Sequence, residues 1–305
     1  MAARLNPGWY LLLYHNVSWE ESPFLWHIGG TCPPDIFRDH VEECSRLGDL
    51  VSIQDGFEVI QKGKIDRPLL SFWFDDGFAG VRKHAAPVLA EWGITGATSV
   101  CSHFATRKEL FWRLKLSYLN AVGAGGRLRS RLHKYGCSLS DSLSEFTLTN
   151  FRFELLDIID ELFKEVASSV DQERGVDLFD GPDQLRSLYE QGWVIANHSA
   201  SHYPNRNGLT QNVILKEFED CDTFIDSITG GPSSFWVAPF GTMSPNYVDA
   251  IIREYDSKTI VLVGGTGNTP VSAGPGRILY RVNVPSNDRT AVGSSLAAAS
   301  SRMEL

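Results

Sequence analysis

The sequence is poor in several features that define common protein classes. Its five cysteines are odd in number and scattered, with neither CxxC pairs nor zinc-knuckle spacing, which argues against a disulfide framework or a structural zinc site. Only 28 Lys and Arg residues face 37 Asp and Glu residues, and the net charge of −9 argues against nucleic acid as a partner. The acidic balance also disfavours a polyanionic substrate, although a local basic pocket could override it.

Long hydrophobic runs are lacking as well. No segment reaches the roughly 20 apolar residues of a membrane span, and the apolar run at 9–14 is too short for a signal peptide. Reduced thiols without an export signal predict a cytoplasmic location. With 43% hydrophobic residues, no repeat and no interdomain linker, we expect a single domain over 1–305, with a flexible Ser/Ala-rich tail at 293–305. The sequence does not reveal the oligomeric state.

Apolar runs alternate with amphipathic segments along most of the chain. The runs WYLLLYH at 9–15 and PLLSFWF at 68–74 are typical of parallel strands buried on both faces, whereas 36–47 has helical spacing. This alternation predicts an α/β fold with a mainly parallel sheet, open or closed. The segment at about 107–179 is mostly helical and interrupts the pattern, so we interpret it as an insertion. Further strands are expected at 96–102, 192–196, 234–237, 259–263 and 278–284, and helices at 80–92, 182–191, 211–229 and 244–254.

Three of the predicted strands end in polar side chains. His15 follows the first run, the pair Asp75 and Asp76 follows the second, and the segment NHSASH from Asn197 to His202 follows a later one. Because the carboxyl ends of parallel strands meet on one rim, these groups are expected to share a site.

The pair His198 and His202 has the spacing of metal ligands. Two imidazoles four residues apart can be aimed at one ion by a helical turn or a tight loop, and Asp76 is the best third ligand. An isolated pair of this kind is more often surface or core histidine, but the strand-end context favours a metal site. Asp75 could then act on the activated water, although an Asp-Asp-Gly turn also serves as ordinary turn chemistry through Gly77.

Three motifs occur in a recognisable order: FDDG at 74–77, HSxxH at 198–202 and APFG at 238–241. They resemble the motifs of the polysaccharide deacetylase family, carbohydrate esterase family four, and the likeness covers most of the chain outside the insertion. The resemblance implies a distorted (β/α) barrel with Asp75 as catalytic base. It also implies one divalent ion held by Asp76, His198 and His202, with zinc expected first and cobalt, nickel, manganese or iron as alternatives.

The chain departs from the family pattern in its general acid. The family usually ends with a Leu-x-His motif that supplies this group, but no histidine follows His202. The segment LLLYHNV is similar to the N-terminal Tyr-His segment of the subgroup that processes bacterial biofilm polyglucosamine, in which the strand order is permuted. His15 is therefore the candidate acid.

A second departure concerns the arginine that usually orients the catalytic aspartate, because Val237 stands at its position. Arg281 in ILYRVNV could supply the charge from another strand, and an ordinary salt bridge at the surface or the bottom of the barrel is the alternative.

Together these features predict a metal-dependent hydrolase that removes an N-acetyl group from an amino sugar. A cytoplasmic site would imply a nucleotide-linked, lipid-linked or small sugar rather than a mature polysaccharide. The alternatives are removal of another acyl group, such as formyl, from a small molecule, or a catalytically silent metal- or glycan-binding module. The candidate substrate-contacting residues, with the backbone N–H groups near the first as a candidate oxyanion site, are Phe78, Tyr203, Trp236, Pro239 and Phe240.

Overall fold

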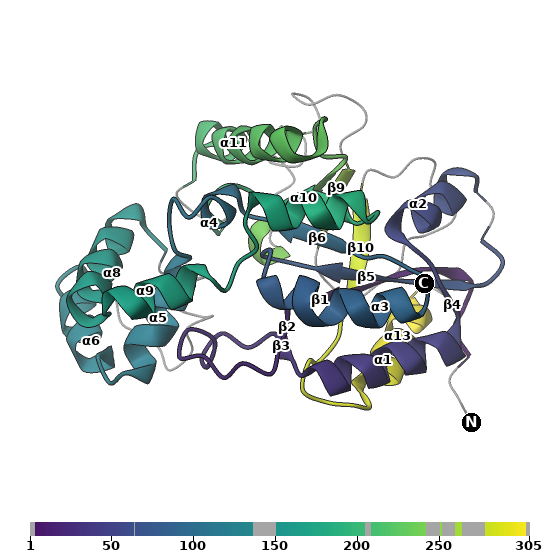
Figure 1. Ribbon diagram of the computed structural model, residues 1–305, viewed down its shortest axis with the longest axis horizontal. Coiled ribbons are helices and arrows are strands. Elements are labelled where there is room, and N and C mark those ends of the chain that lie inside the picture. The colour runs from purple at the N-terminus through teal and green to yellow at the C-terminus, as the bar shows by residue number, and fades with distance from the viewer. Residues whose placement is uncertain are drawn as a thin grey trace.

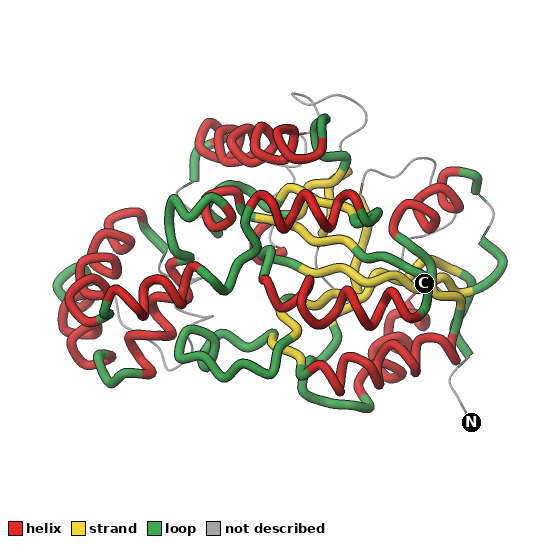
Figure 2. Tube along the Cα trace, in the orientation of Figure 1, coloured by secondary structure: helices red, strands yellow, loops and turns green. Residues whose placement is uncertain are grey.

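The computed structural model describes residues 4–63, 65–136, 151–204, 209–241, 251, 260–263 and 278–302. Strands lie at the centre and helices surround them (Figures 1 and 2). The strands of the main sheet are β1 Gly8–Tyr14, β4 Asp49–Leu50, β5 Pro68–Phe74, β6 Ala97–Val100, β7 Val194–Asn197, β8 Phe235–Val237, β9 Ile260–Val263 and β10 Ile278–Asn283. A separate small sheet pairs β2 Asn16–Val17 with β3 Thr31–Cys32.

The main sheet is parallel throughout and closes on itself. Its order is β4-β5-β6-β7-β8-β9-β10-β1, and β1 also pairs with β5 along its whole length, from Gly8 opposite Pro68 to Tyr14 opposite Phe74. The helices that connect and cover the strands are α1 Pro34–Leu47, α2 Ile53–Gln61, a π-helical turn Val81–Ala85, α3 Ala86–Glu91, α4 Ser102–Ala105, α10 Pro182–Glu190, α11 Gln211–Thr229 and α13 Ala291–Ser301. The predicted α/β fold with a distorted barrel is therefore confirmed.

Alternate strand residues fill two different apolar layers, because successive side chains of a strand point to opposite faces. One set, which includes Trp9 and Leu11 of β1 and Trp73 of β5, packs together inside the barrel. The other set, which includes Leu12 and Phe72, packs against the surrounding helices. Each large apolar side chain buried in this way contributes about 1.5–3 kcal/mol.

Helix α2 covers the amino-terminal mouth of the barrel. Its Gly56 lies so close to Trp9 that a Cβ atom there would come within 2.4 Å of the indole ring. Ile53 of the same helix joins the inner cluster. The amino end of the barrel is thereby filled, and the carboxyl ends of the strands are left to form a site.

The described helices of the insertion at 107–179 gather at one end of the molecule (Figure 1). Its own apolar cluster joins the barrel rim through Phe78 and Phe179, whose rings stack with centroids 5.0 Å apart. Two backbone hydrogen bonds, Ala79 N to Leu178 O and Asp180 N to Gly77 O, fasten the same junction. Residues 137–150 of the insertion lie outside the described residues, and its described helices are α5 Trp112–Ala121, α6 Gly125–His133, α8 Phe153–Val166 and α9 Ser169–Val176.

The prediction of a flexible tail from residue 293 needs correction. Residues up to Ser301 belong to α13, in which Val292, Leu296 and Ala299 are buried. Small apolar side chains at helical spacing form a face that packs against the main core, so the Ser/Ala-rich composition is not a sign of disorder here.

Three further predictions concern a helix at 244–254, the lack of a membrane span and the state of the cysteines. The helix expected at 244–254 lies almost entirely outside them. Among the helices that the structure describes, none combines the length and apolar character that a membrane span requires. The four described cysteines are free and buried: Cys32, Cys44, Cys101 and Cys221.

Candidate active site

Four polar side chains continue the inward-facing positions at the carboxyl end of the barrel. Each lies two residues after an apolar side chain of the inner cluster, so the alternation of the strand directs it toward the barrel axis. Each is also buried. They are Asp75 after β5, Ser99 on β6, His198 after β7 and Arg281 on β10.

Asp75 is held at one of its two carboxylate oxygens. Arg281 Nη1 donates to Asp75 Oδ1 at 2.7 Å, and Ser99 Oγ donates to the same oxygen. The Asp75 backbone N–H bonds to the carbonyl of Tyr14 on the neighbouring strand. Burial by itself raises the pKa of Asp75, but the charges of Arg281, His198 and His15 outweigh it and hold the pKa below its ordinary range. Asp75 is therefore ionised, and its Oδ2 remains available.

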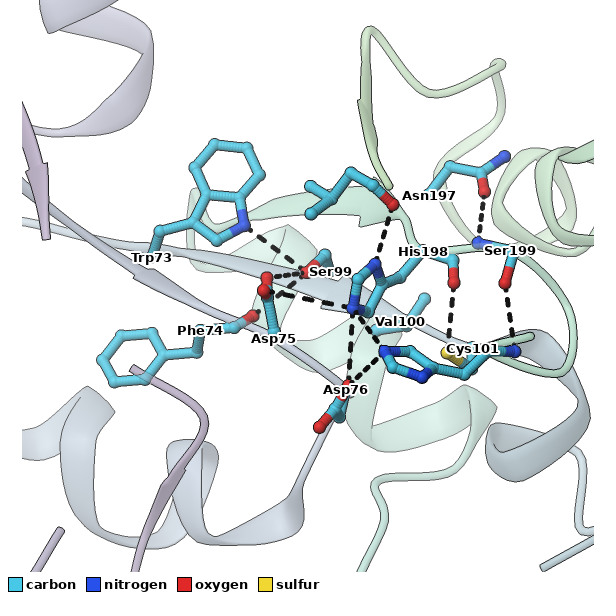
Figure 3. Close-up of polar contacts among 12 residues, drawn as sticks. Trp73, Phe74, Asp75, Asp76, Ser99, Val100, Cys101, Asn197, His198 and Ser199 are labelled. Carbon is cyan, nitrogen blue, oxygen red and sulfur yellow. Dashed lines mark hydrogen bonds and ion pairs between the residues drawn. The ribbon is translucent and has the colours of Figure 1, made fainter. Parts of the chain in front are cut away.

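Asp76, His198 and His202 bring three ligand atoms together. His198 Nε2 and His202 Nε2 lie 3.1 Å apart, and they lie 3.4 and 3.2 Å, respectively, from Asp76 Oδ1. Ligands about 2.0–2.1 Å from a tetrahedral zinc ion are separated by about 3.4 Å. The trio thus has the spacing of a metal site, and both aspartates point toward His198 (Figure 3).

The chemistry of these donors also fits a divalent cation. His198 Nδ1 donates to the carbonyl of Val237 at 2.8 Å, which leaves the Nε2 lone pair for a ligand bond. Asp76 Oδ1 is buried and accepts no hydrogen bond from the described residues. Burial is the largest influence on His202 and lowers its pKa to about 3, so this imidazole is neutral, as a ligand must be.

Left-handed backbone conformations concentrate at this site. Among the described residues, five other than glycine have such a φ, and Asp76, Ser199, His202 and Phe240 are four of them, with φ between 55° and 74°. Conformations of this kind typically cost of order 1–3 kcal/mol each and persist where the surroundings impose them. The segment 198–202 is therefore a tight loop, held by hydrogen bonds from Ser199 N to Asn197 Oδ1 and from His202 N to Ser199 Oγ.

His15 lies beside both aspartates. It directly follows β1, whose last residue Tyr14 bonds to the backbone of Asp75. Because Tyr14 is opposite Phe74 in the pairing of β1 with β5, the next residues, His15 and Asp75, lie level at the same end of the barrel. The ring packs against Gly30, where a Cβ atom would come within 3.4 Å. His15 thus borders the site and is only half-buried.

The predicted substrate contacts divide into two groups. Trp236 is only 2% exposed and packs against Phe218 in a separate apolar cluster, so its prediction as a substrate-contacting residue needs correction. Pro239 and the Phe78 ring are also buried. Tyr203 and Phe240 remain partly exposed, and the Phe240 ring lies 4.6 Å from that of His202.

Sequence reasoning missed four contributors to the site. Ser99 could have been found from strand alternation, because it shares the inward face of β6 with Ala97. The Val237 carbonyl accepts the hydrogen bond of His198, and the identity of a side chain does not reveal such a backbone role. Phe111 and Arg113 come from the insertion, where no pattern in the sequence connects them to the catalytic motifs.

Comparisons with known proteins agree with this geometry. A polysaccharide deacetylase family model matches residues 62–259. Comparison with curated proteins found no match. Among solved structures, the Streptococcus pyogenes deacetylase PplD in complex with acetate is 12% identical, covering 96% of this chain and 99% of its own, with a TM-score of 0.61.

Two further structures are similar over nearly the whole chain. IcaB from Ammonifex degensii is 14% identical, covering 97% of this chain and 98% of its own, with a TM-score of 0.60. A de-N-acetylase from Aggregatibacter actinomycetemcomitans is 14% identical, covering 94% and 99%, also with a TM-score of 0.60. At such low identity these likenesses establish the shared fold. Because the family model covers well over half of the sequence, this chain belongs to the polysaccharide deacetylase family, hydrolases of the amide bond in N-acetylated sugars.

Proposed function

We propose that this protein is a metal-dependent N-deacetylase of an amino sugar, with Asp76, His198 and His202 binding one divalent ion, zinc in the first instance. The observation that carries the proposal is the near-tetrahedral spacing of the three ligand atoms beside an ionised Asp75. A divalent ion held there would polarise the acetyl carbonyl and lower the pKa of a water molecule toward neutrality.

Asp75 is positioned to take a proton from the attacking water. Its Oδ1 is engaged by Arg281 and Ser99, whereas Oδ2 faces the trio, 4.0 Å from His198 Nε2. The free oxygen is thus the proton acceptor, and the two hydrogen bonds to the other oxygen fix the direction in which it points. The family's usual arginine is replaced by Val237 in this chain, and Arg281 on β10 provides the positive charge beside Asp75 instead.

His15 is proposed as the general acid. An amine is a poor leaving group, so it must be protonated as the carbon–nitrogen bond breaks, and an imidazole can deliver that proton near neutral pH. Both His15, directly after β1, and Arg281, on β10, lie outside the residues that the family model matches, and β1 pairs with β10. This placement supports the permuted arrangement suggested by the LLLYHNV segment.

The substrate is proposed to be an N-acetylated amino sugar in nucleotide-linked, lipid-linked, oligomeric or free form. Acetate release from each of these forms, measured with and without a zinc chelator, tests the proposal. We expect turnover that the chelator abolishes and added zinc restores. Turnover that persists in excess chelator would contradict the metal chemistry, and zinc uptake without any turnover would favour a silent binding module. Cell fractionation would test the predicted cytoplasmic location separately.

A further inference from the structure

The two imidazoles of the trio are held in different ways. His198 donates from Nδ1 to the carbonyl of Val237 at 2.8 Å, and a hydrogen bond of this kind commonly fixes the ring of a metal-bound histidine. His202 Nδ1 is also buried, but it has no hydrogen-bond partner in the part of the chain that the structure describes. Within the described residues, the orientation of the His202 ring therefore depends on contacts of another kind.

The backbone of His202 is fixed by hydrogen bonds. Its N–H donates to Ser199 Oγ at 3.1 Å, and the preceding Ser201 N–H donates to Glu217 Oε2 of α11 at 2.6 Å. These bonds position the Cα atom of His202 but do not set the torsion about its Cβ–Cγ bond, which has only broad preferences in histidine. The ring needs further contacts to keep Nε2 directed at the other ligands.

Two phenyl rings pack against the His202 imidazole. The Phe111 ring centroid lies 4.9 Å away with an angle of 64° between the planes, and that of Phe240 lies 4.6 Å away with an angle of 66°. Both arrangements are edge-to-face, a geometry that the charge distribution of aromatic rings favours. Such contacts resist rotation of the imidazole, because rotation would drive it into close-packed neighbours.

Phe111 is the better anchored of the two phenyl rings. It is 1% exposed, stacks on Phe104 of α4 with centroids 4.9 Å apart and belongs to the apolar cluster of the insertion. It directly precedes α5, and its carbonyl accepts hydrogen bonds from Leu114 N and Lys115 N in the first turn of that helix. Phe240, in contrast, is partly exposed. The insertion thus presents a fixed aromatic ring to one ligand of the trio.

We propose that Phe111 is a positioning residue for the metal site: it holds the imidazole of His202 so that Nε2 faces the other two ligand atoms, and the insertion thereby raises the affinity for the ion. This rests on the proposed metal-dependent function. A ligand ring that is already oriented loses less conformational entropy on binding, so its preorganisation appears as affinity. Substitution of groups that orient metal ligands typically costs about 10- to 100-fold in metal affinity or activity.

The zinc affinity of the whole chain, measured by competition with a chromophoric chelator, tests this role. Phe111→Leu keeps an apolar side chain but removes the ring, and we expect about a tenfold loss of affinity, rising to about 100-fold in Phe111→Ala. Cobalt-substituted Phe111→Leu protein should also show altered visible absorption bands, because these bands report the geometry of the coordinating atoms.

Phe163→Leu is the matched control. Phe163 is buried in the same apolar cluster and packs against Phe24 and Tyr118, so the change should destabilise the insertion to a similar degree. We expect wild-type zinc affinity and a wild-type cobalt spectrum for this variant. An equal loss of affinity in both leucine variants would mean that any damage to the insertion weakens the site, and it overturns the proposal, as does wild-type affinity in Phe111→Leu.

Metal binding and turnover together separate this role from the proposed function. Zinc uptake without deacetylation by the wild type would contradict the function, while a weaker affinity of Phe111→Leu would still support the positioning role. Deacetylation by the wild type together with unchanged zinc affinity in Phe111→Leu would overturn the positioning role alone. Thermal unfolding checks that each variant is folded during the titration, and if Phe111→Ala does not fold, the milder Phe111→Leu decides the outcome.

Discussion

The active site has two halves that are built by different means. The barrel half consists of Asp75, Ser99, His198 and Arg281, and the rim half of Asp76, His202, Phe240, Phe111 and Arg113. Side chains of the barrel half are directed inward by strand alternation and are fixed by short buried hydrogen bonds. The rim half depends on left-handed residues and on a helix of the insertion. We infer that the barrel half positions the catalytic base and one metal ligand, and that the rim half completes the metal site and builds the wall beside it.

Replacement of each of the two adjacent aspartates should separate the halves most clearly. Asp75→Asn should reduce kcat/KM by at least about 10³-fold with full zinc content, because it removes the base and leaves the trio intact. Asp76→Asn should lose both zinc and turnover. Metal content by mass spectrometry together with acetate release measures both effects. If Asp75→Asn loses the metal and Asp76→Asn keeps it, the two roles are reversed.

His15→Ala should have the next largest effect. Without an acid for the leaving amine, turnover should fall about 10²- to 10³-fold while zinc binding is preserved. The loss should shrink for an activated ester substrate, whose leaving group does not need a proton. His27→Ala, at an exposed histidine of the following loop, is the matched control. Wild-type rates in His15→Ala would remove His15 from the mechanism.

Arg281→Met tests whether Arg281 lowers the pKa of the catalytic base Asp75, and the pH dependence of kcat/KM measures the effect. Burial raises the pKa of Asp75 and Arg281 lowers it, so loss of the guanidinium should raise this pKa and move the acid limb of the kcat/KM profile to higher pH. We expect about a 10- to 100-fold loss at neutral pH. An acid limb at its wild-type position would contradict the assignment.

The ion pair between Asp75 and Arg281 should stabilise the fold more at neutral pH than at acidic pH. Because the pKa of folded Asp75 is lowered, its ion pair stabilises the fold above the unfolded pKa, and this contribution is lost as pH falls through the folded value. The destabilisation by Arg281→Met should therefore be larger at neutral than at acidic pH, about 3–5 kcal/mol for an uncompensated buried charge. Arg289→Met, which breaks exposed pairs with Asp35 and Asp39, should change stability far less, because solvent screens those charges.

Ser99→Ala should have the smallest effect. It removes one of two hydrogen bonds to Asp75 Oδ1, and Arg281 still holds that oxygen. We expect about a tenfold loss in kcat with little change in KM or zinc affinity. A loss as large as that of Arg281→Met would show that the hydroxyl, rather than the guanidinium, orients the base.

Residue patterns alone predicted the parallel strands and the helices between them, because local physics controls these elements, whereas the closed barrel was implied only by the family resemblance. Apolar runs free of polar alternation identified the buried parallel strands, and polar residues just after them located Asp75, Asp76 and His198. These patterns misjudged side chains whose surroundings come from distant segments. Trp236 lies beside a catalytic motif in the chain but is covered by α11, and the Ser/Ala-rich tail is a helix because the main core buries one of its faces.

What the amino-acid sequence determined by itself is the alternation of strands and helices and the order of the motifs, since both follow from residue spacing along the chain. Only the tertiary structure decided that Arg281 reaches Asp75, that the Val237 carbonyl orients His198, and that Arg113 of the insertion borders the trio. These contacts join residues far apart in the chain, and their partners are selected by barrel closure and by the packing of the insertion, which no local pattern encodes.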